Sequence, residues 1–167
     1  MSPSSALIAC VGCHAMVPDL PEQYGPANQY IGTSPGCWQI FGEVSTKEFP
    51  TLNIRGLLVD TYMVQHHGVS SRQAIQSVAR HLLGLYWTLE CDLPFAKAKR
   101  AMSHAPVDKF YWLEPPTSSG PLTIVDIAQI SDEKVSVDLI KQWATTTWEA
   151  WSQHHQTIRK WASLSFS

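Results

Sequence analysis

The sequence predicts a mostly α-helical protein: a compact bundle of about five helices with an irregular N-terminal layer rich in proline and glycine. Apolar residues recur at helical spacing, capping residues bracket those segments, and no segment alternates polar with apolar residues over any length. The 167 residues are 44% hydrophobic and 16% charged, a composition typical of a folded chain with a core. We therefore expect a single domain over 1–167, with 1–33 as a loop layer or metal knuckle and 34–167 as the bundle.

End signals place the first two helices. Ser34 is an N-cap candidate followed by proline at the first helical position, which predicts a helix over about 35–48. A second helix is expected over about 57–67, because Gly68 is a typical residue just past a helix C-terminus.

Capping residues also place the next elements. Ser70 and Gln73 have the spacing of a capping box and predict the start of a third helix. Its apolar stripe consists of Ile75, Val78, Leu82, Leu85 and Leu89. A shorter helix is expected over 94–102, followed by a loop, and Thr123 with Asp126 predicts a brief helical turn.

The last segment, over about 136–162, has the clearest helical pattern. At about 100° per residue, its inward-facing candidates lie within about 40° of one line. They are Ile140, Ala144, Thr147, Trp151, His154, Ile158 and Ala162. We predict one long helix with this stripe toward the core.

Charge and hydropathy exclude several classes of partner. The net charge is -2 and the basic residues are scattered, so no nucleic-acid surface is predicted. No apolar run approaches the roughly 20 residues of a membrane span. Leu7 to Cys10 is similar to a lipidation box, but it lacks a basic start and a preceding apolar stretch. We expect a cytoplasmic protein with reduced thiols, whose partner is a small molecule or another protein.

The segment Cys10-Val-Gly-Cys13-His14 has four interpretations. The C-x-x-C-H pattern attaches c-type haem, but this attachment occurs in exported compartments, and we expect a cytoplasmic protein. A thioredoxin-like pair requires a strand-to-helix junction, whereas this pair lies in a proline-rich stretch. A zinc knuckle needs two thiolates two residues apart and a glycine that lets the backbone fold around the ion. Small buried thiols without a metal are the fourth interpretation.

A zinc site would need two ligands besides Cys10 and Cys13. Cys37 is the natural third thiolate, and the fourth is His14 or a histidine of the helices, His66 by preference. This hypothesis predicts about one zinc ion per chain. The zinc would be structural with four protein ligands, and catalytic if one position is left for water.

A second group of polar residues lies on the predicted helices. Imidazoles from three helices can meet inside a bundle as a metal or acid–base centre. We predict a buried cluster of Asp60, His66, His81 and His154 or His155. The candidate catalytic residues are Asp60, His81, His154 and His155. Taken singly, each histidine is better explained as a core or surface residue, and a histidine at a helix C-terminus is favoured by the helix dipole.

Six segments occur in a characteristic order: "CVGC", "SPGCWQIFGEV", "VDTYMVQHHG", "SVARHLLGLY", "WLEPP" and "WEAWSQHHQTIRKW". From about Cys10 to Trp161 the chain resembles the bacterial and fungal family filed as domain of unknown function 5946. The resemblance implies one compact domain with no assigned activity. It places at motif positions Cys10, Cys13, Cys37, Asp60, Gln65, His66, His81 and the His154–His155 pair.

The chain departs from the family pattern at two places. Family members typically have a histidine where this chain has Asn28, and another in the segment that here runs from Asn53 to Leu58. A metal site using either position would be one ligand short here, which favours His66 as the ligand.

Three hypotheses about function follow. The first is a zinc-binding domain. The second is a small-molecule enzyme (a lyase, isomerase, cyclase or hydrolase) that uses Asp60 and a histidine for acid–base chemistry in an aromatic pocket. The third is an interaction domain whose tryptophans contact a partner protein. Trp143, Trp151 and Trp161 have core spacing, whereas Trp38 and Trp112 can line a pocket.

Overall fold

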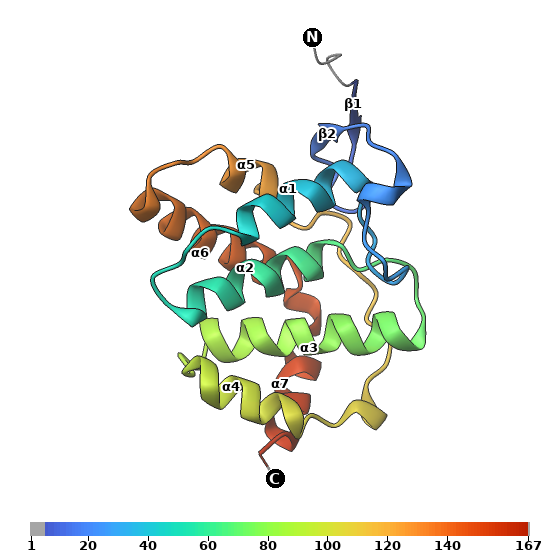
Figure 1. Ribbon diagram of the computed structural model, residues 1–167. Coiled ribbons are helices and arrows are strands. Elements are labelled where there is room, and N and C mark those ends of the chain that lie inside the picture. The colour runs from blue at the N-terminus through green and yellow to red at the C-terminus, as the bar shows by residue number, and fades with distance from the viewer. Residues whose placement is uncertain (1–5, 167) are drawn as a thin grey trace.

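The computed structural model describes residues 6–166 and confirms a mostly helical fold (Figure 1). Within these residues the chain forms seven α-helices and one two-stranded hairpin. The hairpin strands are β1 (Leu7–Ala9) and β2 (Met16–Pro18). The helices are α1 (Pro35–Ser45), α2 (Leu52–Gln65), α3 (Arg72–Leu89), α4 (Phe95–Ser103), α5 (Ile124–Ala128), α6 (Glu133–Ala150) and α7 (His155–Leu164). Short 3-10 turns lie at Glu22–Tyr24, Val107–Lys109 and Ser152–His154.

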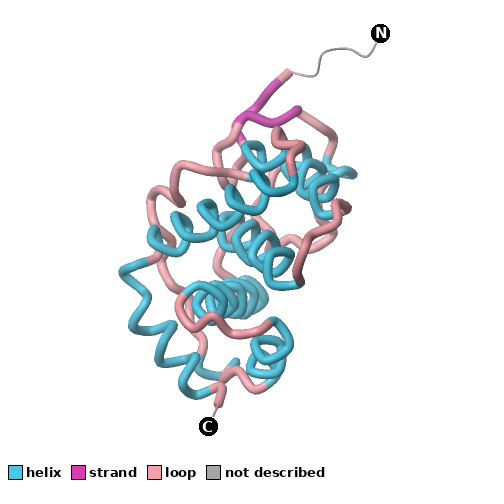
Figure 2. Tube along the Cα trace, turned by 90° about the vertical axis from the view of Figure 1, so that its left-hand side faces the viewer, coloured by secondary structure: helices cyan, strands magenta, loops and turns pink. Residues whose placement is uncertain are grey.

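Helix α2 is the centre of the arrangement. It packs against both α3 and α6 and also contacts α1 and α4. Helix α1 rests on α5, whereas α3 contacts α4 and α7. In Figure 1, α1, α2 and α3 follow one below another, with α4 and α7 beneath α3. Figure 2 shows the hairpin at the end of the molecule opposite the C-terminus.

Most tryptophans belong to the core. Five are at most 4% exposed: Trp87, Trp143, Trp148, Trp151 and Trp161. Trp38 and Trp112 are half-buried and pack against the same core. The tryptophans therefore fill the interior of the described chain, and they do not form the flat exposed patch that the interaction hypothesis requires.

The N-terminal layer contains a small β-hairpin that the sequence did not predict. Residues Leu7 and Pro18 face each other at one end of the ladder, and Ala9 and Met16 at the other. Strands of three residues are too short to show alternation, so a pattern search takes them for loop.

The observed helix starts refine the predicted ones. Helix α2 begins at Leu52, not Leu57, because the Thr51 side chain accepts a hydrogen bond from Ile54 N. It ends at Gln65, so the two following histidines lie beyond it. The N-cap of α3 is Ser71 and not the predicted Ser70. The capping box of Thr123 and Asp126 is confirmed at α5.

The prediction of one long C-terminal helix is wrong. Helix α6 ends at Ala150, and the chain turns through the residues Ser152–His154 before α7 begins. Because the chain turns here, α6 can pack on α2 while α7 packs on α3. The apolar stripe continues across the turn, since Trp151 and Ile158 are both fully buried. Both helices face one core, so the periodicity hides the break.

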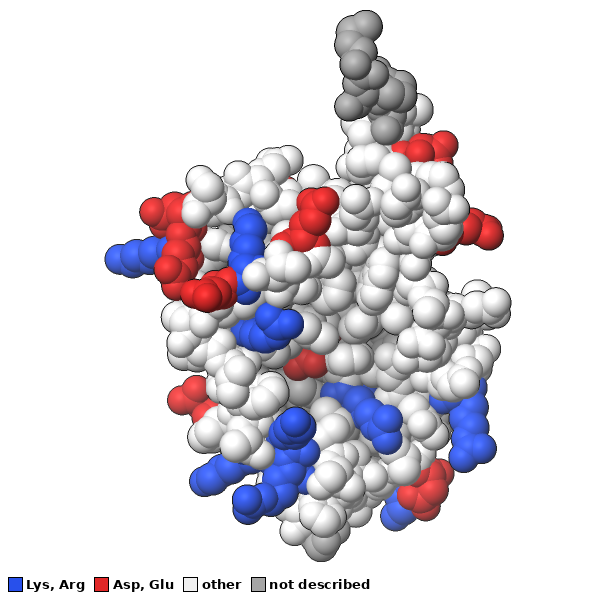
Figure 3. Space-filling model, viewed as in Figure 1, with Lys and Arg blue, Asp and Glu red and all other residues white. Residues whose placement is uncertain are grey.

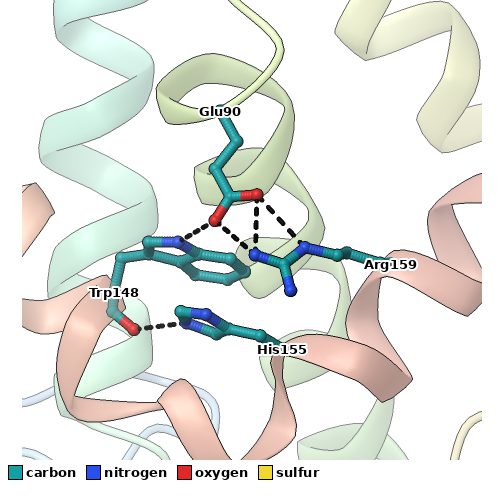
Figure 4. A network of polar contacts seen from close by, with 4 residues as sticks. All are labelled: Glu90, Trp148, His155 and Arg159. Atoms are coloured by element: carbon teal, nitrogen blue, oxygen red, sulfur yellow. Dashed lines mark hydrogen bonds and ion pairs between the residues drawn. The ribbon is translucent and has the colours of Figure 1, made fainter.

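A polar network fastens this turn to the end of α3 (Figure 4). Glu90 accepts hydrogen bonds from Trp148 Nε1 at 2.9 Å and from Arg159 Nη2 at 2.9 Å. The ring of His155 stacks on Trp148 at 3.9 Å, and its Nε2 donates to Trp148 O at 2.8 Å. Partial burial alone would raise the pKa of Glu90, but the hydrogen bonds from Arg159 and Trp148 hold this pKa below its usual range.

Replacing Glu90 tests this network. Because the folded-state pKa of Glu90 is lowered, its stabilising contribution is present above the unfolded pKa and is lost as pH falls through the folded pKa. We expect Glu90→Gln to lower the free energy of unfolding by about 1 kcal/mol at pH 7, since the pair is partly exposed. Urea denaturation at neutral and acidic pH should show the two proteins converging in acid. A difference independent of pH, or an equal loss in Glu149→Gln on the exposed face of α6, would contradict this account.

Candidate metal centre

The turn between β1 and β2 directs two thiols inward. Cys10 N donates to Ala15 O at 2.8 Å, and His14 N donates to Cys10 O at 2.9 Å. His14 has a φ of 66°, in the left-handed region, which lets the chain reverse tightly. Cys10 is fully buried and Cys13 is 8% exposed, whereas the His14 side chain is exposed. His14 is therefore not brought into the thiol group as a fourth ligand.

Two more donors reach the same point from other segments. Cys37 lies in the first turn of α1, and His66 directly follows the last residue of α2. The donor atoms of Cys10, Cys13, Cys37 and His66 all lie within 4.8 Å of one another, and all four residues are buried. The structure thus unites the four residues that the sequence suggested as metal ligands in a buried group that could hold a metal ion.

Two distances within this group match the edges of a zinc tetrahedron. Bonds of about 2.3 Å to sulfur and about 2.0 Å to nitrogen imply about 3.8 Å between sulfurs and about 3.5 Å between sulfur and nitrogen. Cys13 Sγ and Cys37 Sγ are 3.9 Å apart, and Cys37 Sγ is 3.4 Å from His66 Nε2. A disulfide would bring two sulfurs to about 2.05 Å, and all three cysteines are free.

Residues around the group orient its donors. His66 Nδ1 lies 2.6 Å from Tyr62 O, and because a carbonyl only accepts, Nδ1 carries a proton and donates. Nε2 therefore faces Cys37, the orientation a metal-binding histidine needs. The Tyr62 ring stacks on His66 at 3.9 Å, and its hydroxyl donates to Cys37 Sγ at 3.5 Å. Thr33 Oγ1 lies 2.7 Å from that hydroxyl and 3.7 Å from Cys10 Sγ.

Ser34 takes a different role from the one predicted. It occupies the N-cap position of α1, but its side chain caps nothing in the helix. Instead its Oγ accepts a hydrogen bond from Val11 N at 3.0 Å, and its own N donates to Cys10 Sγ at 3.5 Å. Ser34 therefore joins the start of α1 to the hairpin turn. Thr33 and Ser34 have no sequence signal for this role, because only tertiary contact creates it.

Because the four donors are buried and lie close together, they shift one another's pKa values. Hydrogen bonds from Cys13 and Cys37 lower the pKa of Cys10. Hydrogen bonds with Cys10 and Cys37 raise the pKa of Cys13. Burial alone would lower the pKa of His66, but its contacts with Cys10 and Cys37 raise it to about 9. A bound divalent ion would replace the protons that these donors otherwise carry.

Glycines allow the segments to approach this closely. A Cβ on Gly12 would clash with Gly32 O and lie 2.6 Å from Cδ2 of His66. A Cβ on Gly32 would lie 2.6 Å from the backbone of Gly68, which itself has a φ of +52°. Gly32 N also donates to His66 O at 2.9 Å. The hairpin turn therefore sits directly against the ring of His66, and Gly32 contacts the His66 backbone.

Asp60 and His81 form a separate pair. His81 Nδ1 donates to Asp60 Oδ1 at 2.8 Å, and the two side chains are 25% and 19% exposed, respectively. Burial raises the pKa of Asp60, and the hydrogen bond from His81 offsets part of that effect. The predicted cluster is thus divided: His66 joins the thiols, and Asp60 and His81 bond to each other.

The remaining predicted residues lie elsewhere. His154 Nε2 contacts Glu114 O at 2.7 Å, and His155 belongs to the network beside Trp148. Their place in the acid–base cluster is wrong, because the turn after α6 reorients both imidazoles. Gln65 is 1% exposed and donates to Leu122 O at 2.9 Å, so it holds the loop before α5.

Fold and donors together define an α-helical protein with a buried group of three cysteines and one histidine. The chain matches the model of the Family of unknown function (DUF5946) over residues 8–152. This match covers most of the chain, so the protein belongs to that family. Neither the curated proteins nor the solved structures contain a match. None of the described helices combines the length and apolarity needed to cross a membrane.

A methyl group at Gly12 tests the close approach at the metal centre. We expect Gly12→Ala to destabilise the fold by about 2 kcal/mol, because Cβ must displace the Gly32 backbone or the His66 ring. Gly42→Ala is the matched control, since Gly42 lies in α1 with open space around it. That change should be neutral or stabilising by up to about 1 kcal/mol. Equal melting behaviour of the two variants would refute the packing described for Gly12.

Proposed function

We propose that the protein is a zinc-binding helical domain in which Cys10, Cys13, Cys37 and His66 hold one structural zinc ion. The observation that carries this proposal is the convergence of four buried donors within 4.8 Å of one another, with the two distances at Cys37 Sγ suited to a tetrahedral ion. The donors come from three separate segments, so their meeting is a property of the fold.

The donor chemistry favours zinc over other common ions. Three thiolates and an imidazole are soft and borderline ligands, which suit zinc, whereas calcium and magnesium prefer oxygen. Iron–sulfur clusters most often use four cysteines, and the fourth cysteine of this chain, Cys91, is exposed and lies outside the group.

The closed ligand set favours a structural role. A catalytic zinc keeps one position for water, whereas four protein ligands complete a tetrahedron. Cys10 and Cys37 are fully buried and His66 is 1% exposed, which leaves water little access. Zinc held here would fasten the hairpin and the start of α1 to the end of α2, and its binding free energy would add to that of folding.

Metal analysis of tag-free protein tests the proposal directly. We expect about one zinc per chain by mass spectrometry of the metal content, as four protein ligands imply. Cys37→Ser and His66→Asn should lose most of it, because each removes a ligand facing the others. Cys91→Ser is the matched control and should retain it, since Cys91 is exposed. Folded wild-type protein without metal, in a preparation supplied with zinc, would reject the proposal.

Chelation tests the structural role separately. Removing zinc with a strong chelator should lower the melting temperature, and returning zinc should restore it. Free zinc at about 1,000 times its Kd would contribute about 4 kcal/mol to the folded state. The Cys37→Ser variant should not respond to either treatment. A wild-type melting curve that the chelator leaves unchanged, with zinc demonstrably removed, would contradict a structural role.

A further inference from the structure

A second site lies away from the thiol group. A pocket of about 310 Å³ opens between α2, α3 and α4. Its walls are mainly apolar and include Val59, Phe95, Ala98 and Met102. None of the four thiol-group residues lines it, and Asp60 does.

Asp60 supplies the pocket with a partly buried acceptor. His81 occupies Oδ1, whereas Oδ2 accepts no hydrogen bond within residues 6–166. A Cβ on Gly84 would collide with this carboxylate. The carboxylate can therefore occupy its place only because residue 84 has no side chain. A carboxylate placed among apolar walls is costly unless a positive charge or further donors approach it. Burial accordingly raises the pKa of Asp60.

Two cations also line the pocket. Arg55 and Lys99 are exposed side chains among the lining residues, which places them at its mouth. Arg55 Nη1 donates to Ser45 O at 2.9 Å, and this bond holds the guanidinium in place. The bond uses one of the five N–H donors of a guanidinium, so the others can contact a ligand. Figure 3 shows that lysine and arginine side chains of this face gather over its lower half, where α3 and α4 lie.

We propose that this pocket binds a small zwitterion with an apolar body, of the class of the apolar amino acids. Its ammonium group would meet the free oxygen of Asp60, and its carboxylate would meet Lys99 and Arg55. Its apolar body would contact Phe95 and Met102. A volume of about 310 Å³ is at the small end of ligand pockets, which run from about 300 to 1,000 Å³, and suits a molecule of this size. The proposal does not depend on metal binding.

A larger apolar side chain at Gly56 would fill the pocket without changing the charge of its lining. Gly56 is a lining residue in α2, and its Cβ would make an ordinary contact at 3.6 Å with Phe95. A larger side chain would therefore extend into the space between α2 and α4. Helix propensity favours leucine over glycine, so Gly56→Leu should keep α2 folded.

Calorimetric titration with three related probes tests the charge pattern. The probes are L-phenylalanine, phenethylamine (which lacks the carboxylate) and 3-phenylpropionate (which lacks the ammonium). Wild-type protein should bind phenylalanine most tightly and phenylpropionate most weakly. Asp60→Asn should weaken phenylalanine about tenfold or more, because a charge-assisted bond is lost. Lys99→Gln should weaken phenylalanine but leave phenethylamine unchanged.

Two leucine variants separate pocket filling from unfolding. Gly56→Leu should abolish phenylalanine binding while circular dichroism stays helical. Gly42→Leu, on the open side of α1, should bind like wild type. The proposal is overturned if wild-type protein shows no saturable binding of any probe. Binding that Asp60→Asn and Gly56→Leu leave unchanged would also overturn it. Zinc content, measured in the same samples, should be equal in all of them, so failure here leaves the metal centre unaffected.

Discussion

The structure depends on the closure of the N-terminal hairpin over the end of α2. Two strands of three residues are marginal by themselves, so the hairpin needs contacts beyond its own ladder. Those contacts are the thiols of Cys10 and Cys13 beside His66, and the backbone of Gly12 against the His66 ring. Ser34 adds hydrogen bonds from the start of α1. The N-terminal layer, which has no regular pattern in the sequence, is thus organised around the buried group of three cysteines and His66.

Helix α2 explains why the protein has two polar centres. Asp60 and Tyr62 are two residues apart, which separates their side chains by about 200° around a helix. Tyr62 consequently faces the thiol group, where it supports His66, while Asp60 faces α3 and the pocket between α2, α3 and α4. Gln65 occupies a third direction, toward the loop before α5. One helix therefore connects the thiol group, the Asp60–His81 pair and the loop before α5.

Much of the candidate metal site could be predicted because its donors have recognisable residue types and local sequence signals. Two thiols separated by two residues and a glycine indicate a knuckle, and Cys37 follows a strong helix-start signal. The sequence already favoured His66 over His14, and the fold supplies the physical reason, because the turn that buries both knuckle thiols leaves His14 exposed. The acid–base cluster was overextended because helical periodicity says which face is buried, not which helices meet there.

By itself, the sequence determined the helical class, the inward faces of the helices and the four donors with metal-ligand chemistry. These follow from side-chain spacing and residue type, which act over a few neighbours. The tertiary structure alone decided that the last segment bends at Trp151, that His81 pairs with Asp60, and that Thr33 and Ser34 support the thiol group. Such outcomes depend on which distant segments pack together, because the free energy of burial is summed over the whole core.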